Sequence, residues 1–568
     1  MKNFIPKIKK LKKVWFGLFL FLILSIFSYW PLLKPGYFSM HDDVQVMRLY
    51  QMERCFLDGQ LPCRLVPDMG AGYGHPLYNY HPVFPYYLGI IFRLFNLSFL
   101  DISKILFLLA ILLSGIFMYF LVRQFFGNFA ALLGSLFFIY APYHAVDVYV
   151  RGALTESWGI TFFPLIFLSF YKFVKEEKIR WFVLSIFSLT FLFLSHNIMT
   201  LIFTPIAFFW GMFWIFFFKK WKTIWKLFFV FIWALGLAAF FILPAFLERP
   251  FVKIETLISD YYNFRYHFVT LRQLFLDRSF GYGPSRPGPL DDISFQLGWP
   301  HWWLAVFSVF IAFFFLLKKK KEQFYLFSFW ILLFFFSVFM THAKSFFLWE
   351  MVPLLSFVQF PWRFLGMAMF ASSFLAAGTI LFLRGKLKYL FGGVLIILVI
   401  LLNFGYFKPE KHFPSMTDKE KLSGEEWKNQ SMATLLDYLP KKVQEFPKEL
   451  ASSNPWVVEG EAKISEFRKR SNFWRFTIET SGMKPVLVSV PVFDFPNWVV
   501  LVDQKPVSFS SDNPLGIIEV WVPSGKHTVV GWFIDTKLRT FANFLSLLSF
   551  AFLILFLVYV DQKNKKTF

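Results

Sequence analysis

The sequence contains little charge and little cysteine. Asp, Glu, Lys and Arg make up 17% of its 568 residues, against about 25% in an ordinary soluble domain, so one large soluble core with a charged shell is excluded. Two cysteines are too few for a disulfide scaffold or a Cys-based zinc site. The apolar residues form solid runs rather than alternating with polar ones, which excludes an outer-membrane barrel.

Hydrophobic residues are abundant instead, at 57% of the chain, and 85 residues are Phe. Runs of about 20 apolar residues can cross a membrane core. They predict a polytopic α-helical membrane protein of twelve spans, near 14–33, 103–122, 128–146, 156–173, 181–195, 197–217, 225–246, 300–317, 323–341, 364–383, 388–406 and 541–560. The uncharged stretch 181–217 is too long for one span, so a hairpin is predicted at Ser195-His196-Asn197.

Basic residues collect in the segments that would share one side of this membrane. Of the 58 Lys and Arg residues, 25 fall in 1–13, 123–127, 172–180, 218–226, 318–322, 384–388 and 561–568. Loops rich in Lys and Arg stay cytoplasmic, which predicts a plasma (inner) membrane protein with both termini in the cytoplasm. The net charge of +22 then reflects topology and anionic membrane lipids as partners, so no nucleic-acid partner is expected.

The predicted domains follow from this topology. A multi-span domain covers 1–406, and residues 541–568 form the last span with a basic cytoplasmic tail. Between them, residues 407–540 contain short alternating runs separated by turns, which predict an extracytoplasmic β-sandwich of six to eight strands. The long loops on the outer side are 34–102, 247–299 and 342–363.

The strongest candidate for chemistry directly follows the first span, in SMHDDVQ (residues 39–45). Two adjacent carboxylates at a membrane edge are costly unless they are used or paired. Asp42 is the first candidate for a catalytic residue and Asp43 the second. The alternative is that one of them caps the helix predicted from residue 44 onward. Both could also contribute to a divalent metal site, although neighbouring residues alone do not complete one.

Further polar and aromatic residues of the first outer loop could bind a sugar or a lipid headgroup, with an interfacial aromatic belt as the alternative. These candidates are His41, Gln45, Arg48, Tyr73, His75, Tyr78, Asn79 and His81. Cys55 and Cys63 lie in the same loop, where an outer compartment permits a disulfide without requiring one.

Charges next to the membrane recur in later segments. Arg151 and Glu156 are five residues apart and can pair with each other, whereas Arg363 has no close partner in sequence, which favours binding of an anionic phosphate. The neighbouring candidates for substrate binding are His196, Asn197, Gln359 and Trp362.

Several stretches resemble the GT-C class of membrane glycosyltransferases, and within it the bacterial membrane proteins labelled "6-pyruvoyl-tetrahydropterin synthase-related" and the YfhO-type proteins. They are HDDVQ, DGQLPCRLVPDMGAGYGHPLYNYHPVFPYYLG, RGALTESWG, SHN, QFPWRFLG and the tail NWVVLVDQKPVSF…VPSGKHTVVGWF. The resemblance implies a GT-C-like fold and sugar transfer from a polyprenyl-phosphate donor to an envelope glycan, lipid or protein on the outer face. Asp42 or Asp43 would be general base or metal ligand, and Arg151, Arg363 and Arg48 would contact the donor phosphate.

Two other functions stay open. A non-catalytic GT-C-like membrane protein in envelope assembly would keep the same fold without the reaction. A lipid or glycan transporter would favour interrupted helices and mid-membrane charges, whereas here the polar residues gather at one membrane face. No cofactor is required by the sequence beyond a possible divalent ion.

Overall fold

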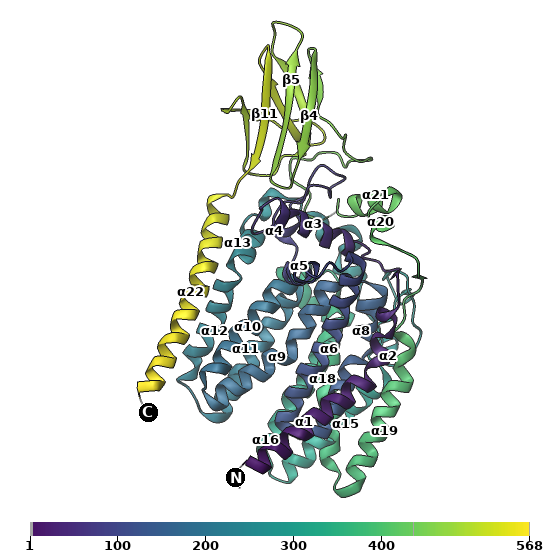
Figure 1. The fold of residues 1–568 in the computed structure, drawn as a ribbon. Helices are drawn as coiled ribbons and strands as arrows, with labels where there is room; N and C mark the ends of the chain where they lie inside the picture. Colours follow the sequence, from purple (N-terminus) through teal and green to yellow (C-terminus); the bar gives the residue numbers. More distant parts are fainter. Residues whose placement is uncertain (1–3, 436, 567–568) are drawn as a thin grey trace. The chain divides into compact units, whose positions relative to one another are not determined.

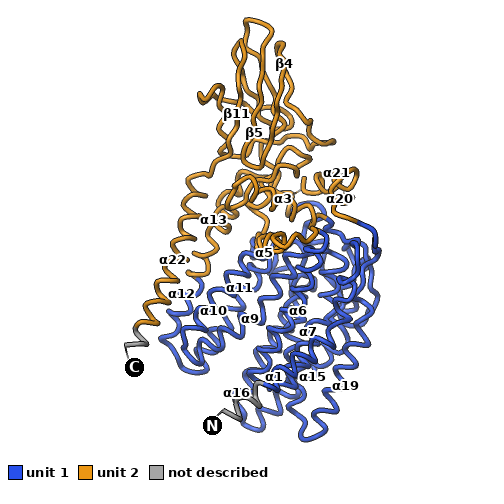
Figure 2. The backbone as a smooth tube through the Cα atoms, in the orientation of Figure 1, with its two compact units in different colours: residues 1–43, 100–231, 258–416 blue, residues 44–99, 232–257, 417–568 orange. Residues whose placement is uncertain are grey.

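The computed structural model describes residues 4–435 and 437–566 (Figure 1). Residues 1–3, which begin the predicted basic N-terminal segment, lie outside this part. The chain forms two compact units (Figure 2). Unit 1 contains Met1–Asp43, Leu100–Phe231 and Ile258–Met416, and unit 2 contains Val44–Phe99, Ile232–Leu257 and Thr417–Phe568. In unit 2, residues 44–99 of the predicted first outer loop pack with the C-terminal part of the chain, and the predicted domain boundaries stay a prediction.

Unit 1 is a bundle of helices, with α12 continuing into unit 2 and α6 beginning there. The helices are α1 (Phe4–Leu24), α2 (Ile26–Tyr29), α6 (Phe99–Phe126), α7 (Asn128–Ile139), α8 (Pro142–Ala145), α9 (Leu154–Glu176), α10 (Ile179–Ser195), α11 (Asn197–Phe218), α12 (Thr223–Leu237), α14 (Leu271–Phe275), α15 (Trp299–Leu317), α16 (Lys321–Thr341), α17 (Phe346–Met351), α18 (Leu365–Thr379) and α19 (Gly385–Asn403).

Among the described residues, eight helices are long and apolar enough to cross a membrane, or up to eleven if each of three bent pairs is one span. Each of the twelve predicted spans falls on one of these or on α10, which has only 17 residues. The hairpin predicted at His196 is present, since α10 ends at Ser195 and α11 begins at Asn197. The protein is therefore a multi-pass membrane protein, and the side that each loop faces stays a prediction.

Two spans have the largest buried share among the described helices. In the 18-residue apolar window of each span, the buried share is 94% for Pro361–Phe382 and 89% for Leu154–Glu176, whereas it is 28% for Gly385–Tyr406. Small residues allow the close approach of α18 and α7: a Cβ on Gly134 would lie 2.9 Å from the Cβ of Ala377. Close packing through small side chains is how membrane helices associate without a hydrophobic driving force. Three of the candidate residues of unit 1, Glu156, Trp362 and Arg363, lie in these two spans.

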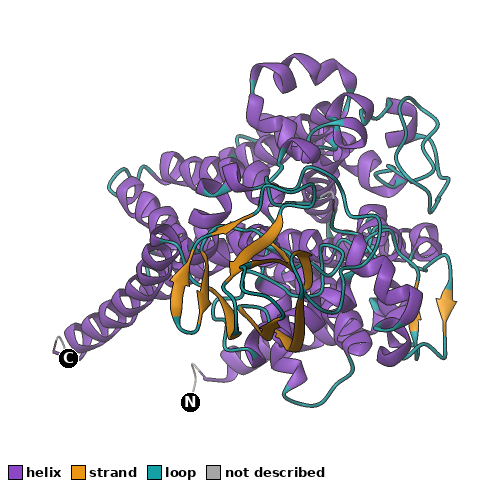
Figure 3. Cartoon of the chain, turned by 90° about the horizontal axis from the view of Figure 1, so that it is seen from above, coloured by secondary structure: helices purple, strands orange, loops and turns teal. Residues whose placement is uncertain are grey.

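Unit 2 contains an antiparallel β-sandwich, which confirms the predicted fold of the C-terminal region. One sheet has the order β3-β6-β10-β9 and the other β4-β5-β11-β7-β8. Outside the sandwich, the described strands are β1 (Tyr37–Phe38) and β2 (His412–Phe413), a short ribbon in unit 1 (Figure 3). The sandwich strands are β3 (Trp456–Glu459), β4 (Ala462–Lys469), β5 (Phe473–Thr480), β6 (Val486–Phe493), β7 (Trp498–Val502), β8 (Lys505–Val507), β9 (Phe509–Ser510), β10 (Ile517–Val522) and β11 (Lys526–Phe533).

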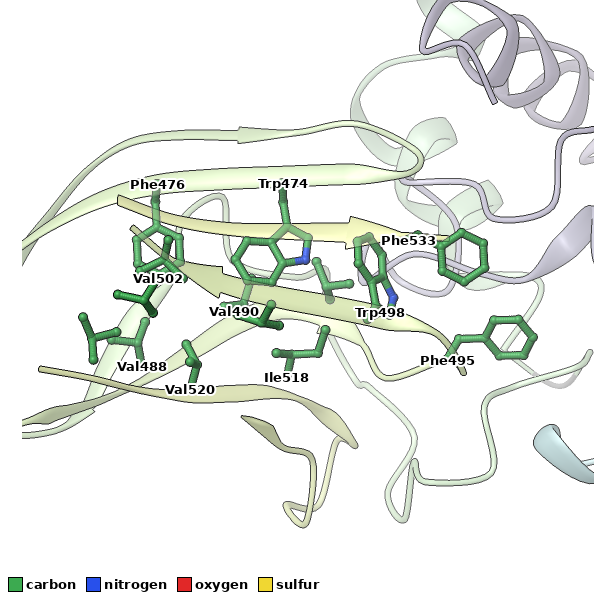
Figure 4. Close-up of a cluster of buried hydrophobic side chains, with 14 of the residues drawn as sticks. Trp474, Phe476, Val488, Val490, Phe495, Trp498, Val502, Ile518, Val520 and Phe533 are labelled. Atoms are coloured by element: carbon green, nitrogen blue, oxygen red, sulfur yellow. The ribbon is translucent and has the colours of Figure 1, made fainter. Parts of the chain in front are cut away.

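Alternating side chains of the two sheets meet in one apolar core (Figure 4). Trp474 and Phe476 of β5 face Val488 and Val490 of β6 across this core. The buried tryptophans of the sandwich therefore serve interior packing. The described part of the sandwich has nine strands rather than the six to eight predicted, because turns divide some of the alternating runs into two or more strands. Asp503 and Gln504 have φ values of +48° and +67°, which suits a two-residue hairpin turn between β7 and β8.

The other helices of unit 2 are α3 (Gln45–Leu57), α4 (Leu77–Tyr80), α5 (Phe84–Arg93), α13 (Ala239–Leu247), α20 (Asp418–Lys421), α21 (Gly424–Met432) and α22 (Lys537–Lys566). Buried charges hold these segments together. Glu248 Oε2 accepts hydrogen bonds from Arg539 Nε at 2.8 Å and from Asn79 Nδ2 at 3.0 Å. Arg64 in turn donates to Asn79 Oδ1 at 3.2 Å. Cys55 and Cys63 form a disulfide in the same unit.

We expect His75 to make the stability of unit 2 depend on pH. Burial lowers the pKa of His75 to about 4, whereas an unfolded histidine has a pKa near 6.5. Between these values the unfolded chain binds the extra proton, so stability should fall as the pH falls from about 6.5 to 4, by at most about 1.4 kcal/mol per pH unit. His75→Gln should flatten this part of the profile, measured by thermal unfolding in detergent.

His527 provides a control of opposite sign. Its Nδ1 lies 2.6 Å from Asp503 Oδ2, and this hydrogen bond raises the pKa of His527. Its contribution is present below the unfolded pKa and is lost as the pH rises through the folded value. His527→Gln should therefore steepen the acid-side loss of stability. A profile unchanged by His75→Gln would contradict the assignment of His75.

Candidate functional site

A buried carboxylate near the start of α9 is the centre of the candidate site. Glu156 Oε2 accepts hydrogen bonds from Arg151 Nη2 at 2.8 Å and from Arg363 Nε at 3.3 Å. Its other oxygen, Oε1, accepts a hydrogen bond from the Tyr143 hydroxyl at 2.6 Å. The Glu156 side chain is almost completely buried. One carboxylate thus holds two guanidinium groups that come from distant segments of the chain.

A second carboxylate binds the same arginine. Arg151 Nη1 donates to Asp147 Oδ1, and Asp147 is fully buried. Asp147 belongs to η2 (Val146–Val150), a single π-helical turn, and such turns occur frequently at functional sites. The guanidinium carbon of Arg151 also lies 4.6 Å from the centre of the Trp362 ring, which adds a cation–π contact.

Arg363 is held by the turn that precedes it. It lies in η9 (Pro361–Phe364), and its Nη1 donates to Gln359 Oε1 and to the main-chain oxygen of Val358, both at 2.8 Å. Gln359 has a φ of +65°, which a non-glycine residue rarely adopts. This turn brings both acceptors to the same guanidinium nitrogen. Together with these contacts, five sequence-predicted residues lie in one place: Arg151, Glu156, Gln359, Trp362 and Arg363.

We call Asp147, Arg151, Glu156 and Arg363 the Glu156 cluster. Two carboxylates and two guanidinium groups balance, so the formal charge of the cluster is zero. The sequence allowed Arg151 to pair with Glu156 because the two residues are five positions apart, and the structure contains this pair. The partner of Arg363 lies 207 residues away in sequence, so no local pattern could reveal it. Arg363 is therefore ion-paired within the protein, and its predicted binding of a phosphate stays a prediction.

The acid pair Asp42–Asp43 is anchored beside Arg151 through the main chain. His41 N and Asp42 N donate to the oxygens of Val150 and Arg151, each at 2.9 Å, and His41 Nε2 lies 2.7 Å from the oxygen of Tyr282. Both aspartates are partly buried. Helix α3 begins after them with Val44 at the N-cap position, so neither aspartate is the N-cap residue of α3.

Gly152 allows this close approach. A Cβ at this position would lie 2.3 Å from Met40 Sδ, and the φ of Gly152 is +65°, a value that favours glycine. The segment before the acid pair therefore rests directly on the turn after Arg151.

His196 lies at the predicted break between α10 and α11. Its Nδ1 accepts a hydrogen bond from Met199 N at 3.0 Å, so the side chain caps α11. A Cβ on Gly159, one turn after Glu156, would lie 3.2 Å from the Cβ of His196. The hairpin with His196 and Asn197 is thus packed against the first turns of α9.

The loop between α13 and α15 contributes a histidine that the sequence did not single out as a site residue. The ring of His267 lies 4.6 Å from that of Phe360, two residues before Trp362. His267 Nδ1 contacts Ser285 Oγ at 2.8 Å, and Ser285 Oγ contacts Asp291 Oδ1 at 2.9 Å. Burial lowers the pKa of His267 and raises the pKa of Asp291. Both shifts favour the uncharged forms.

The remaining predicted residues lie in unit 2, and the Glu156 cluster is formed within unit 1 alone. Each of them has a partner in unit 2. Gln45 Oε1 accepts a hydrogen bond from the Tyr86 hydroxyl, which also contacts His81. The Tyr78 hydroxyl donates to the main-chain oxygen of Arg48, and His75 contacts the main-chain oxygen of Asp437. The ring of Tyr73 stacks on that of Phe493, and Asn79 contacts Arg64 and Glu248.

An apolar groove of unit 1 includes the residue that follows Arg363 in the chain. It has a volume of about 510 Å³ and is lined by side chains of α11, of α16 and of residues 348–364. Phe364, the residue after Arg363, is one of its lining residues. Every lining residue is apolar, so the groove suits a hydrocarbon chain. Tyr143 and this groove are site features that sequence reasoning missed. The Asp147–Arg151 spacing of four residues is a signal in the sequence for Asp147.

A metal ion needs several oxygen, nitrogen or sulfur ligands close together. Among the described residues, no group of three or more His, Cys, Asp or Glu side chains is placed to hold one. Asp42 and Asp43 therefore have no third such ligand beside them, and the divalent ion that the sequence allowed gains no support from a donor set.

Comparison with known proteins yields a match to a family model and similarity to solved structures. Residues 74–247 match the model of a family described as dolichyl-phosphate-mannose-protein mannosyltransferase. This segment is less than half of the chain and includes Arg151, Glu156 and His196. No curated protein matches the sequence.

Among solved structures, the chain is similar to the archaeal oligosaccharyltransferase AglB from Archaeoglobus fulgidus, solved with an inhibitory peptide and a dolichol-phosphate. The identity is 12% and the TM-score is 0.39. The similarity covers 71% of this chain and 56% of that chain, so this chain spans little more than half the length of the archaeal enzyme.

We expect Glu156 and Arg363 to be energetically coupled. Removing one partner of a buried ion pair leaves a buried charge unpaired, at a cost of about 3–5 kcal/mol. Glu156→Gln and Arg363→Gln should each lower the free energy of unfolding. The double variant should lose less than the sum of the two, with a coupling of at least about 1 kcal/mol. Chemical unfolding in detergent measures all three.

An exposed ion pair of unit 1 supplies the control. Arg272 Nε lies 3.2 Å from Asp277 Oδ1, and the arginine is largely exposed. Asp277→Asn should change the free energy of unfolding by less than about 1 kcal/mol. Additive losses from Glu156→Gln and Arg363→Gln would refute the coupling.

Proposed function

We propose that the protein is a membrane glycosyltransferase that takes a sugar from a polyprenyl-phosphate-linked donor and transfers it to an acceptor of the cell envelope. The observation that carries this proposal lies within unit 1, where Arg363 of the Glu156 cluster directly precedes Phe364 of the apolar groove. A lipid-linked sugar needs cations for its phosphate and an apolar path for its prenyl chain. The family match over 74–247 supports the same class of donor.

In the proposed reaction, the acceptor hydroxyl oxygen forms a bond to the anomeric carbon of the sugar. The bond between that carbon and the phosphate oxygen breaks, and its electron pair leaves with the lipid phosphate. Asp42 takes the hydroxyl proton as general base, with Asp43 as the second candidate. Arg151 and Arg363 stabilise the negative charge that grows on the phosphate.

Glu156 acts in this scheme as a positioning residue. It holds both guanidinium groups by hydrogen bonds at 2.8 and 3.3 Å, so they are preorganised before the donor arrives. Because the cluster is neutral, the phosphate binds through hydrogen bonds and the local field rather than through excess positive charge. The further substrate contacts proposed within unit 1 are His41, His196, Asn197, Gln359 and Trp362. For the candidates in unit 2 the roles predicted from the sequence are kept as separate proposals: the donor phosphate for Arg48, and substrate binding for Gln45, Tyr73, His75, Tyr78, Asn79 and His81.

The proposed topology has both termini in the cytoplasm, with the first long loop and the β-sandwich outside the cell membrane. The positions of Lys and Arg support this orientation. The YfhO-type resemblance belongs to the same proposal, and the acceptor is left as an envelope glycan, lipid or protein.

One observation favours a second candidate, a non-catalytic membrane protein of envelope assembly. Both carboxylates of the Glu156 cluster are paired with Arg151 or Arg363. A network of this kind stabilises a fold without any reaction, so the second candidate predicts that the acid pair can be neutralised without a loss of function.

The test neutralises the acid pair. Asp42→Asn combined with Asp43→Asn removes the proposed base, so transfer should fall by at least about 100-fold, the lower range for loss of a general base. The variant should insert into membranes and unfold at the wild-type temperature. The measurement is incorporation of radiolabelled mannose from polyprenyl-phosphate mannose into the envelope fraction of membrane vesicles.

Asp512→Asn is the control, because Asp512 is exposed beyond β9 in the sandwich and takes no part in the proposed chemistry. Wild-type transfer by the double variant would defeat the base assignment. Absence of transfer by the wild-type protein with this donor and with other polyprenyl-phosphate sugars would favour the second candidate.

A further inference from the structure

The disulfide-closed loop Cys55–Cys63 in unit 2 carries two exposed leucines. Leu57 is 78% exposed and Leu61 is 62% exposed. The loop is nevertheless rigid: besides the disulfide, Gln60 Oε1 accepts hydrogen bonds from the main-chain nitrogens of the two residues after Cys63, at 2.7 and 2.9 Å. A fixed loop that presents leucines outward keeps them available for an apolar partner.

The loop is attached to the base of the β-sandwich. Asp58 Oδ2 accepts a hydrogen bond from Ser471 N, in the turn between β4 and β5, at 2.7 Å. Just after this turn, the ring of Phe473 lies 4.4 Å from that of Trp532 on β11. Trp532 is 44% exposed and Ile534 is 48% exposed. Two further exposed apolar side chains therefore flank the strand that leads out of the sandwich.

The same loop is attached to the first turns of α22. Arg64, next to the disulfide, donates from Nη2 to Asn543 Oδ1 at 2.8 Å and from Nε to Asp535 Oδ1 at 3.2 Å. Helix α22 begins at Lys537, and its span Lys537–Gln562 is only 11% buried, so it faces lipid along most of its length. Within unit 2, the loop therefore lies at the depth where this span enters the membrane.

We infer that Leu57, Leu61, Trp532 and Ile534 form a membrane seat, a surface by which the sandwich and its disulfide loop rest on the lipid interface around α22. Continuity with the lipid-exposed surface of α22 identifies lipid as the occupant. Leucine and tryptophan side chains suit the boundary between headgroups and acyl chains. Isolated exposed apolar residues need no explanation, but these four lie on segments of unit 2 that hydrogen bonds and a ring contact link to one another and to the start of α22.

The test uses a nitroxide label on Ile534→Cys in vesicles of phosphatidylethanolamine and phosphatidylglycerol. Because the two native cysteines are joined, the introduced cysteine is the single free thiol. Oxygen concentrates in lipid and a nickel chelate stays in water. The ratio of oxygen to nickel collisions should be several-fold higher at position 534 than for a label on Met483→Cys, a residue that is 97% exposed in the turn between β5 and β6.

A second variant tests the leucines themselves. Leu57→Asp with Leu61→Asp, added to Ile534→Cys, should raise the nickel collision rate at position 534 at least twofold, because the loop no longer rests in the interface. Both side chains are exposed, so folding should tolerate the change. Equal ratios at positions 534 and 483 would overturn the membrane seat. A nickel rate unchanged by the two aspartates would overturn the part assigned to the loop.

Discussion

The structure of unit 1 depends on the neutralisation of charge next to the membrane core. An ionised side chain in or near hydrocarbon is costly unless an opposite charge compensates it. Glu156 meets this constraint by binding Arg151 and Arg363, and Asp147 shares the first of these arginines. The contacts join the turn before α9, α9 itself and the segment that enters α18. Since one lost partner leaves an unpaired buried charge, these segments are constrained to one relative arrangement.

This constraint also shapes the chemistry that the site can perform. A phosphate that approaches two preorganised guanidinium groups, each already paired with a carboxylate, gains hydrogen bonds at little reorganisation cost, but it does not meet a free cation. Glu156 must therefore keep Arg151 and Arg363 close together without sequestering all of their donors. The main-chain bonds that hold Asp42 beside Arg151 then matter, because they link the candidate base to the candidate phosphate contacts through fixed backbone rather than through side chains.

Local patterns in the sequence predicted the spans, the hairpin at His196 and the strands, because hydropathy and alternation are local properties. They also allowed the pairing of Arg151 with Glu156. The partner of Arg363 could not be predicted from a local pattern, because Glu156 is 207 residues away in the sequence. In the first outer loop, by contrast, the sequence suggested binding residues whose side chains make contacts inside the protein. The histidines and tyrosines of this loop were typical of a binding surface, yet the structure pairs or stacks those of residues 73–81 inside unit 2, and composition does not distinguish the two uses.

Unit 2 contains a second buried charge that an ion pair neutralises. Arg539 is fully buried near the start of α22, and Glu248 at the end of α13 neutralises it at 2.8 Å. Arg64 of the first loop joins this region through Asn79. Strand β11 is followed after three residues by α22, and a short connection alone would allow the sandwich to rotate relative to this helix. The buried ion pair between Arg539 and Glu248 opposes this rotation, because breaking it would leave an unpaired buried charge. The sandwich is therefore fixed to α13 and α22 by electrostatics as well as by the chain connection.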